Sequence, residues 1–502
     1  MRSITRHLPW LILLCMALAT GSAIVLYGIS AGVFGGEEES YALTELSVSD
    51  TAAVSEMQPQ PLPPLPAEMR GVWIATVLNI DFPKELGDAE AQKKELINIL
   101  DTARASGLNT VFFQVRPTGD AFYPSRIFPW SEYLSGSAGK DPGYDPLAFV
   151  IEEAHSRGLA LHAWINPFRL TMGSADQPQN TTAVLHTASP VKNRPELTLS
   201  AGDGRLYLNP GEPEVQAIVL AGIREILENY AVDGIHLDDY FYPSDPNYDD
   251  SAAYTKYGQP LGLTLDDWRR ANTRSLIQEI QSLVREVRDE AAFGVSPSGI
   301  WRNKKNSPLG SDSNGFESYA QIYADTRGWV KDGLLDYIAP QLYWVIGKEG
   351  SDYALLARWW EEVCRDTGVR LYIGHGVYRL GSSGEAAWAT AAEIERQIAL
   401  NKELGISDSI FYGYRQIYEN TLGVRDLLQK LYAAPPPLQT QTATLTAPTI
   451  LVYGQRIAFD AYNIGENNFF KLRDLDAAFN FGVDWSAATN TVIIDTSTGY
   501  KE

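Results

Sequence analysis

Eight apolar segments, each followed by a stretch with helical character, fill the middle of this 502-residue chain. The intervening stretches with the strongest helical pattern are residues 89–106, 213–230, 265–290 and 386–404. Strands that alternate with helices form parallel sheets, and strands that are apolar on both faces favour a closed barrel over an open sheet. The sequence therefore predicts an α/β fold, a (β/α)8 TIM barrel, with strands in residues 70–78, 109–117, 159–167, 232–241, 292–299, 335–344, 370–378 and 408–414.

Two stretches of linker composition separate this barrel from the ends of the chain. Residues 37–66 begin with three glutamates and end in a proline-rich run, and residues 433–447 contain three consecutive prolines followed by Thr and Gln. Such stretches are extended and stiff rather than packed. We therefore expect the barrel to span residues 67–432 and a small α+β domain to span residues 448–502, with strand-like runs at 450–453 and 491–494 and a helix-like run at 470–479.

The N-terminal 36 residues have the pattern of a segment that enters a membrane. Arg2 and Arg6 precede an uncharged stretch from residue 8 to residue 36. This stretch exceeds the ~20 residues that cross a bilayer, and positive charge before it predicts an inside N-terminus. We expect a signal-anchor or a long cleaved signal peptide, and both alternatives place the rest of the chain outside the cytoplasm, membrane-anchored or secreted to the cell wall.

Composition narrows the classes of partner and cofactor. The 62 acidic residues outnumber the 41 basic ones, and a net charge of −21 argues against binding to nucleic acid or to anionic lipid. Any membrane contact is therefore expected through the N-terminal segment only. The two cysteines, Cys15 and Cys364, cannot form a zinc-type cluster, and the six histidines are scattered. We expect neither a metal nor a cofactor.

The octet at residues 233–240, Asp-Gly-Ile-His-Leu-Asp-Asp-Tyr, is the most informative stretch for function. It begins as an apolar strand and ends in two adjacent carboxylates, Asp238 and Asp239, followed by aromatic residues. Barrel enzymes carry catalytic groups at the carboxyl ends of their strands, and paired carboxylates perform glycoside hydrolysis. A strand end capped by a turn is the alternative. The pattern predicts Asp238 and Asp239 as catalytic residues.

Polar and aromatic residues at the other strand ends suit an oligosaccharide, because aromatic faces stack on sugar rings while amide and charged groups bind hydroxyls. If Ile235 and Leu237 face the helices, alternation directs His236 and Asp238 into the barrel, and it likewise puts Gln114 and Arg116 on one face. Other strand-end residues are Ser296, His375, Tyr378, Tyr412 and Tyr414. The predicted substrate-binding residues are Gln114, Arg116, Asp120, His162, Trp164, Asn166, Arg169, His236, Tyr240, Tyr242, Gln341, Tyr343 and Trp344.

Motifs along the barrel resemble a known family. They include Met69–Ile74, Gly107–Pro117, His162–Pro167, Asp233–Pro243 and Tyr337–Trp344, and they occur in the order found in the glycosyl-hydrolase-like family 10, the domain-of-unknown-function 187 group. The resemblance covers about residues 68–431. It implies a (β/α)8 barrel, a bacterial envelope location and action on glycan strands, notably those of peptidoglycan.

The C-terminal region resembles a second family. Phe459–Asn463, Asn468–Leu475 and Val483–Trp485 look like the copper-amine-oxidase N-terminal-like (stalk) domain of secreted Gram-positive proteins. Residues 448–502 contain no His or Cys, so copper binding is not expected. The resemblance implies a spacer or a module that interacts with the cell wall.

Adjacent carboxylates constrain the mechanism. Ordinary glycosidases separate their two acids by roughly 5 Å or roughly 6.5–9.5 Å, which neighbouring residues do not readily achieve. One option is substrate assistance, in which Asp238 orients the 2-acetamido group of the sugar and Asp239 donates the proton. The alternative pairs Asp238 with a distant acid such as Asp120 or Glu132.

The sequence thus predicts an extracellular glycoside hydrolase that cleaves β-glycosidic bonds between N-acetylated sugars, with peptidoglycan or a related polysaccharide as its partner. Arg116 and Arg169 are candidates to pair with the lactyl carboxylate of muramic acid. A non-catalytic scaffold that binds cell-wall glycan is the alternative.

Overall fold

The computed structural model describes residues 66–432 and the backbone of short strands between residues 444 and 495. The predicted membrane segment, residues 1–36, and most of the two predicted linkers lie outside the described residues. Among the helices that are described, none combines the length and the apolar character needed to cross a membrane.

Eight parallel strands close into a barrel, as the sequence predicts. Strand β1 pairs with β2 on one side and with β10 on the other, and these two pairings close the ring. Each strand lies within a predicted segment but is shorter, because the chain leaves the sheet to form the loops above it. The strands are β1 (Arg70–Ile74), β2 (Thr110–Arg116), β3 (Ala160–Ile165), β6 (Gly234–Leu237), β7 (Ala292–Val295), β8 (Tyr337–Ile338), β9 (Arg370–Gly376) and β10 (Asp408–Tyr412).

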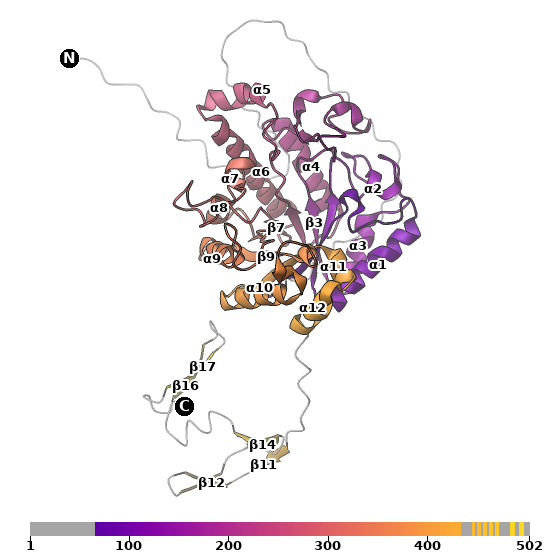
Figure 1. Cartoon of the computed structure of the whole chain (residues 1–502). Coiled ribbons are helices and arrows are strands. Elements are labelled where there is room, and N and C mark those ends of the chain that lie inside the picture. The colour runs from indigo at the N-terminus through magenta and orange to yellow at the C-terminus, as the bar shows by residue number, and fades with distance from the viewer. Residues whose placement is uncertain are drawn as a thin grey trace, which may run out of the picture. The chain divides into compact units, whose positions relative to one another are not determined.

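Helices surround the barrel (Figure 1). Several begin at an Asp or Thr whose side chain accepts a backbone N–H of the first turn, as Asp88 does from Ala91 and Thr264 from Asp267. The predicted helical stretches are confirmed, except that residues 386–404 form a short 3-10 turn before the helix. The larger helices are α1 (Ala89–Ala105), α3 (Pro146–Ser156), α4 (Pro213–Asn229), α6 (Leu265–Val287), α8 (Thr326–Lys331), α9 (Tyr353–Cys364), α10 (Ala392–Glu403) and α12 (Val424–Tyr432).

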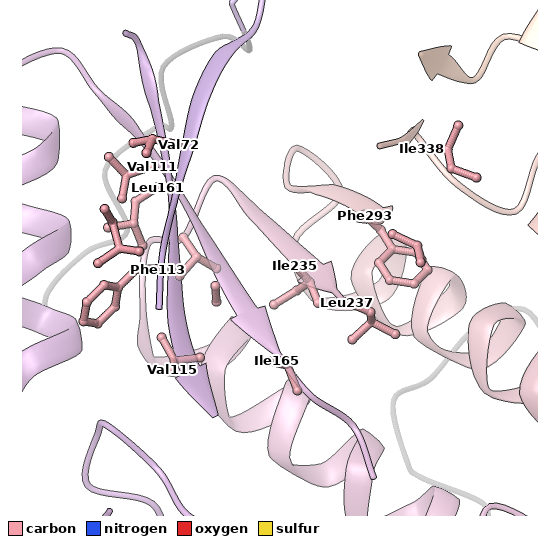
Figure 2. Close-up of a cluster of buried hydrophobic side chains, with 14 of the residues drawn as sticks. Val72, Val111, Phe113, Val115, Leu161, Ile165, Ile235, Leu237, Phe293 and Ile338 are labelled. Carbon is pink, nitrogen blue, oxygen red and sulfur yellow. The ribbon is translucent and has the colours of Figure 1, made fainter. Parts of the chain in front are cut away.

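The main core lies between the strands and these helices. Alternate strand residues such as Val111, Phe113 and Leu161 point outward into it, and so do Ile235 and Leu237 of β6 (Figure 2). Successive side chains of a strand point to opposite faces. The prediction that His236 and Asp238 face the barrel interior is therefore confirmed.

Aromatic side chains fill the interior of the barrel, and inward-facing glycines make room for them. A Cβ on Gly234 would lie 2.4 Å from Nδ1 of His162, and one on Gly294 would lie 2.2 Å from the Tyr337 ring. The interior cluster includes Trp73, Phe112, Tyr337 and Tyr372, all buried. The barrel is thus packed along its axis, and open space along this axis begins above the carboxyl ends of the strands.

A long segment, residues 166–212, connects β3 and α4. It contains an antiparallel hairpin of β4 (Thr198–Ser200) and β5 (Leu206–Leu208). Arg169 joins this hairpin through a backbone bridge to Tyr207. The hairpin therefore anchors the chain that leaves β3 at the edge of the barrel mouth.

Antiparallel strand pairs are described in the C-terminal region. β12 (Thr449–Val452) pairs with β13 (Gln455–Ala458), and β16 (Gly482–Ser486) pairs with β17 (Thr491–Asp495). β14 (Ala461–Ile464) lies between β11 (Thr444–Thr446) and β15 (Asn467–Phe470). The predicted runs at 450–453 and 491–494 coincide with β12 and β17. The predicted helix begins at the last residue of β15 and otherwise lies outside the described residues, and the stalk-domain assignment stays a prediction.

Candidate active site

A cavity of about 200 Å³ opens at the carboxyl ends of the barrel strands. We call it the cleft. Its lining combines two carboxylates with aromatic, amide and apolar side chains contributed by most of the strands. The lining residues are Trp73, Val77, Leu78, Ile80, Gln114, Trp164, Arg169, Met172, Asp238, Asp239, Tyr240, Ser296, Gln341, Tyr343 and Tyr412.

Asp238 lies on the floor of the cleft and accepts four N–H groups. Trp164 Nε1 and Asn166 Nδ2 donate to its Oδ2 at 3.2 and 3.3 Å. Gln341 Nε2 donates to Oδ1 at 3.2 Å, and the backbone N–H of Asp239 donates to the same oxygen at 2.8 Å. N–H donors favour the charged form of a carboxylate. The four donors therefore fix the orientation of the Asp238 carboxyl group.

The surroundings of Asp239 shift the pKa of its carboxyl group. Burial raises the pKa of its carboxyl well above the ordinary value, and the negative charge of Asp238 and a hydrogen bond with Asp238 raise it further. Arg169 opposes this rise with its positive charge. Two adjacent carboxyls that cannot both ionise easily share their protons unequally. The raised pKa of Asp239 suits a proton donor rather than a nucleophile.

A chain of hydrogen bonds connects the first three strands beneath the cleft. Gln114 Oε1 accepts the backbone N–H groups of Thr76 and Val77, and Gln114 Nε2 donates to Oδ1 of Asn166 at 2.7 Å. Arg169 Nη2 donates to the same Asn166 oxygen at 2.9 Å. Asn166 is thereby fixed with its amide nitrogen toward Asp238, so Gln114 and Asn166 position the carboxylate.

Aromatic side chains form the walls of the cleft. The Arg169 guanidinium lies 4.4 Å from the centre of the Tyr240 ring, and Tyr240 is 39% exposed. Later segments of the barrel contribute two further rings of the lining. Tyr343 stacks on Tyr412 with their ring centres 6.0 Å apart. Exposed aromatic faces beside polar groups are suited to bind sugar rings.

His162 and His236, both predicted to bind substrate, lie below the cleft in the sealed interior and do not line it. Burial lowers the pKa of His162 to about 4 and that of His236 well below its ordinary value, so both are neutral. Trp73 Nε1 donates to Nε2 of His236 at 3.0 Å, and the Tyr337 hydroxyl lies 3.0 Å from Nδ1 of each histidine. The two histidines therefore support the floor of the cleft, and the prediction of direct contact is corrected.

Arg116 departs from its predicted position because of a β-bulge. The register of β2 against β3 shifts between Gln114 and Arg116, so that Arg116 pairs with Ile165, whose side chain points outward. The Arg116 guanidinium is buried 3.7 Å from the centre of the Phe128 ring, beside α4. The prediction that Arg116 shares a face with Gln114 is wrong, and Arg116 does not reach the cleft.

Two other predicted binding residues also lie elsewhere. The Tyr242 hydroxyl accepts from Asn272 Nδ2 at 3.0 Å, and its ring packs against Tyr248 and Tyr323 outside the cleft. Trp344 is partly buried, packs against the main core and does not line the cleft. Both residues stabilise the loops that shape the cleft.

Asp120 and Glu132 line a neighbouring cavity of about 110 Å³, which shares only Met172 with the cleft. Burial raises the pKa of Asp120, while hydrogen bonds from Ser131 and Thr118 oppose the rise. The Thr118 hydroxyl donates to Asp120 Oδ1 at 2.7 Å. The role of Asp120 in substrate binding, or as a distant acid that acts with Asp238, stays a prediction.

Sequence reasoning missed a group of lining residues near β1. Trp73 is the inward residue of β1, and the same alternation that located Asp238 could have identified it. Leu78 and Ile80 lie in the following loop, 56% and 41% exposed, with Leu78 in a left-handed conformation at φ 52°. No sequence pattern marks these exposed apolar side chains or Met172 as part of a site.

Comparison with known proteins agrees with this geometry. Residues 68–390 match the model of the family described as glycosyl hydrolase-like 10. Glycosyl hydrolase YngK of Bacillus subtilis (strain 168) is 41% identical over 389 residues, which are 76% of this chain and 75% of that protein. Glycosyl hydrolase DigH of Escherichia coli (strain K12) is 40% identical over 357 residues, 68% of this chain and 80% of that protein.

Among solved structures, the glycoside hydrolase domain of PgaB (BpsB) from Bordetella bronchiseptica superimposes with a TM-score of 0.48 at 14% identity, covering 73% of this chain and 100% of that domain. The family match covers most of the barrel, and the two relatives are each aligned over more than two thirds of their length. The chain belongs to the glycosyl hydrolase-like 10 family and is a glycoside hydrolase with a (β/α)8 barrel.

Proposed function

We propose that this enzyme cleaves β-glycosidic bonds between N-acetylated sugars in the glycan strands of peptidoglycan, outside the cytoplasm, by substrate-assisted catalysis. The observation that carries the proposal is the contrast between two adjacent carboxyls. Asp238 accepts four N–H donors, while burial and the charge of Asp238 raise the pKa of Asp239. Acid and base assignments follow from pairs whose environments push their pKa values apart.

The roles follow from these two environments. Asp239 donates its proton to the glycosidic oxygen as the bond to the anomeric carbon breaks. The carbonyl oxygen of the 2-acetamido group attacks the same carbon, and Asp238 accepts the acetamido N–H and stabilises the positive charge that develops. Water then attacks the anomeric carbon of the cyclic intermediate, giving its proton to the Asp239 carboxylate and restoring the starting state.

The lining of the cleft favours this mechanism over a separated pair of acids. Asp238 and Asp239 are the carboxylates that line the cleft within residues 66–432, and Asp120 and Glu132 belong to the neighbouring cavity. A retaining enzyme needs a second carboxylate about 5 Å away to serve as a nucleophile. A nucleophile supplied by the sugar itself removes that need.

Arg169 is suited to recognise the lactyl carboxylate of a muramoyl residue. Its Nε and Nη2 donate to Pro117 O, and Nη2 also donates to Asn166, so the guanidinium is held against the cleft. Its Nη1 forms no hydrogen bond with a described residue, and a guanidinium pairs well with a carboxylate. This feature favours a muramic acid strand over an uncharged chitin-like strand.

Peptide-stripped glycan strands provide the test. Incubation with the full chain should produce new reducing ends, and Asp238→Asn and Asp239→Asn should each remove them. A thiazoline mimic of the cyclic intermediate should inhibit in competition with substrate. Failure of the thiazoline to bind, together with a covalent glycosyl-enzyme trapped on Glu132 or Asp120, would replace substrate assistance with a two-acid mechanism. Release of reducing ends from chitin fragments alone would overturn the peptidoglycan assignment.

The extracytoplasmic location rests on the sequence of residues 1–36, where two arginines precede a long uncharged stretch. Protease added to intact cells should digest the barrel. Protection of the barrel until the cells are lysed would contradict this location.

A further inference from the structure

A second and larger cavity, of about 530 Å³, lies away from the cleft and shares no lining residue with it. We call it the basic groove. Its walls are the loop of residues 304–312, which follows β7, and the helices α8 and α9. Four cations line it, Lys304, Arg327, Lys331 and Arg358, against two carboxylates, Asp312 and Glu362. This local excess of positive charge contrasts with the net charge of −21 of the chain.

The four cations have no ion-pair or side-chain hydrogen-bond partner among the described residues. The two groove carboxylates, Asp312 and Glu362, leave an excess of two positive charges, and two acids just outside the groove lining are engaged elsewhere. Asp332, next to Lys331, pairs with Arg274 at 2.6 Å, and Glu361 pairs with Arg365. The positive charge of the groove is therefore available to a ligand.

The loop that forms one wall is held rigidly by buried hydrogen bonds. Glu317, 5% exposed, accepts at Oε1 from the backbone N–H of Asn303 at 2.8 Å and from the side-chain amides of Asn303 and Asn306 at 2.6 Å. A Cβ on Gly310 would lie 2.5 Å from the carbonyl oxygen of Arg302, so the turn requires glycine. A preformed wall loses little conformational entropy when a ligand binds.

Trp359 provides an aromatic surface in the groove. Its Nε1 donates to the carbonyl oxygen of Leu309 at 3.2 Å, and its ring stacks on Trp301 with an interplanar angle of 18°. The Arg327 guanidinium lies 5.5 Å from the centre of the Trp301 ring. A fixed indole beside unpaired cations suits a ligand that combines a sugar ring with anionic groups.

We propose that the basic groove binds a segment of an anionic polysaccharide, with a sugar ring on Trp359 and its carboxylate or phosphate groups at Lys331, Arg358, Lys304 and Arg327. This site is separate from the cleft. It would hold the enzyme on a charged polymer while hydrolysis takes place in the cleft. The net negative charge does not prevent this, because remote charges are screened over about 8 Å at physiological ionic strength.

Affinity electrophoresis of the full chain tests the proposal, with gels that contain poly(glycerol phosphate), polygalacturonate or neutral dextran. We expect retardation by at least one of the two polyanions and none by dextran. The double variant Lys331→Gln with Arg358→Gln should weaken the retardation about tenfold, the order expected for two screened charge contacts. The phosphodiester and carboxylate polymers identify which anion the groove prefers.

The matched control removes two exposed cations elsewhere, Lys94→Gln with Lys402→Gln, which changes the net charge equally. This control should keep full retardation, and the groove variant should still cleave short soluble glycans at the wild-type rate. Equal weakening by both double variants would show that binding depends on overall charge and would overturn the proposal. So would equal retardation by dextran, or none by either polyanion. Loss of hydrolysis in Asp238→Asn with unchanged retardation would separate this site from the cleft.

Discussion

The backbone N–H of Asp239 donates to Oδ1 of Asp238 at 2.8 Å, so the main chain of one aspartate holds the carboxyl group of the other. Because they are neighbours, the ionisation of one acts directly on the other. The two groups differ in their contacts: Asp238 accepts four N–H donors, whereas the negative charge of Asp238 adds to desolvation in raising the pKa of Asp239.

Asp239→Asn removes the proposed proton donor and keeps the shape of the side chain. Loss of a general acid lowers rates by roughly 10²–10⁴-fold. We expect kcat on peptide-stripped glycan strands to fall by that order while binding of the thiazoline inhibitor persists, as measured by reducing-end release and calorimetry. Turnover at the wild-type rate would remove Asp239 from the mechanism.

Trp164→Phe isolates one hydrogen bond to Asp238. The substitution keeps an aromatic ring in the cleft but removes the Nε1–H that donates to Oδ2. A hydrogen bond to a charged group contributes roughly 1.5–3 kcal/mol, which corresponds to a loss of about tenfold or more in kcat/KM.

Trp344→Phe is the matched control for this substitution, because Trp344 packs against the main core and does not line the cleft. It should leave kcat/KM close to the wild-type value. Equal losses in the two variants would mean that Trp164 contributes through packing rather than through its N–H.

The sequence predicted the barrel because hydrophobic periodicity is a local property that the fold preserves. The alternation of Ile235 and Leu237 with His236 and Asp238 placed the aspartate correctly on the inner face. The prediction for Arg116 failed because a bulge at the end of β2 adds one residue to the register. A shift of one residue turns a side chain to the other face of the strand. Leu78 and Ile80 were not predictable, since exposed apolar residues in a loop acquire a role only through their position at the cleft.

Arg116→Ala and Arg169→Ala should have different effects, although both arginines are candidates by sequence. Arg116 is 1% exposed against Phe128, so truncation leaves a cavity and should lower the free energy of unfolding by about 2–4 kcal/mol. The KM of the folded Arg116→Ala variant for muramic-containing glycans should equal that of the wild type. Chemical denaturation and steady-state kinetics measure the two quantities.

Arg169→Ala should instead raise KM for muramic-containing strands much more than for chitin fragments, because its guanidinium lines the cleft. A larger loss on muramic strands with Arg116→Ala than with Arg169→Ala would contradict the positions that the structure gives these two side chains.

Leu78→Gly should separate backbone strain from substrate contact. A non-glycine residue at φ 52° costs about 1 kcal/mol, while glycine costs a similar amount in chain entropy, so the free energy of unfolding should change little. The exposed side chain lines the cleft, and its loss should raise KM. The same substitution at Leu422, which is also left-handed at φ 49° and lies outside the cleft, should leave KM unchanged. A rise in KM in both variants would indicate a general loosening of the fold.

The pH dependence of hydrolysis should report the proton on Asp239. Catalysis requires the protonated form, so kcat/KM should fall as pH rises through the pKa of Asp239, which burial and Asp238 raise above its ordinary value. The positive charge of Arg169 lowers this pKa, and Arg169→Gln removes that charge. The alkaline limb of the profile should therefore move to higher pH in this variant, even though the maximal rate falls. Lys402→Gln removes an exposed cation outside the cleft and should leave the limb in place. An alkaline limb that moves to lower pH in Arg169→Gln would show that another group, and not Asp239, carries the proton.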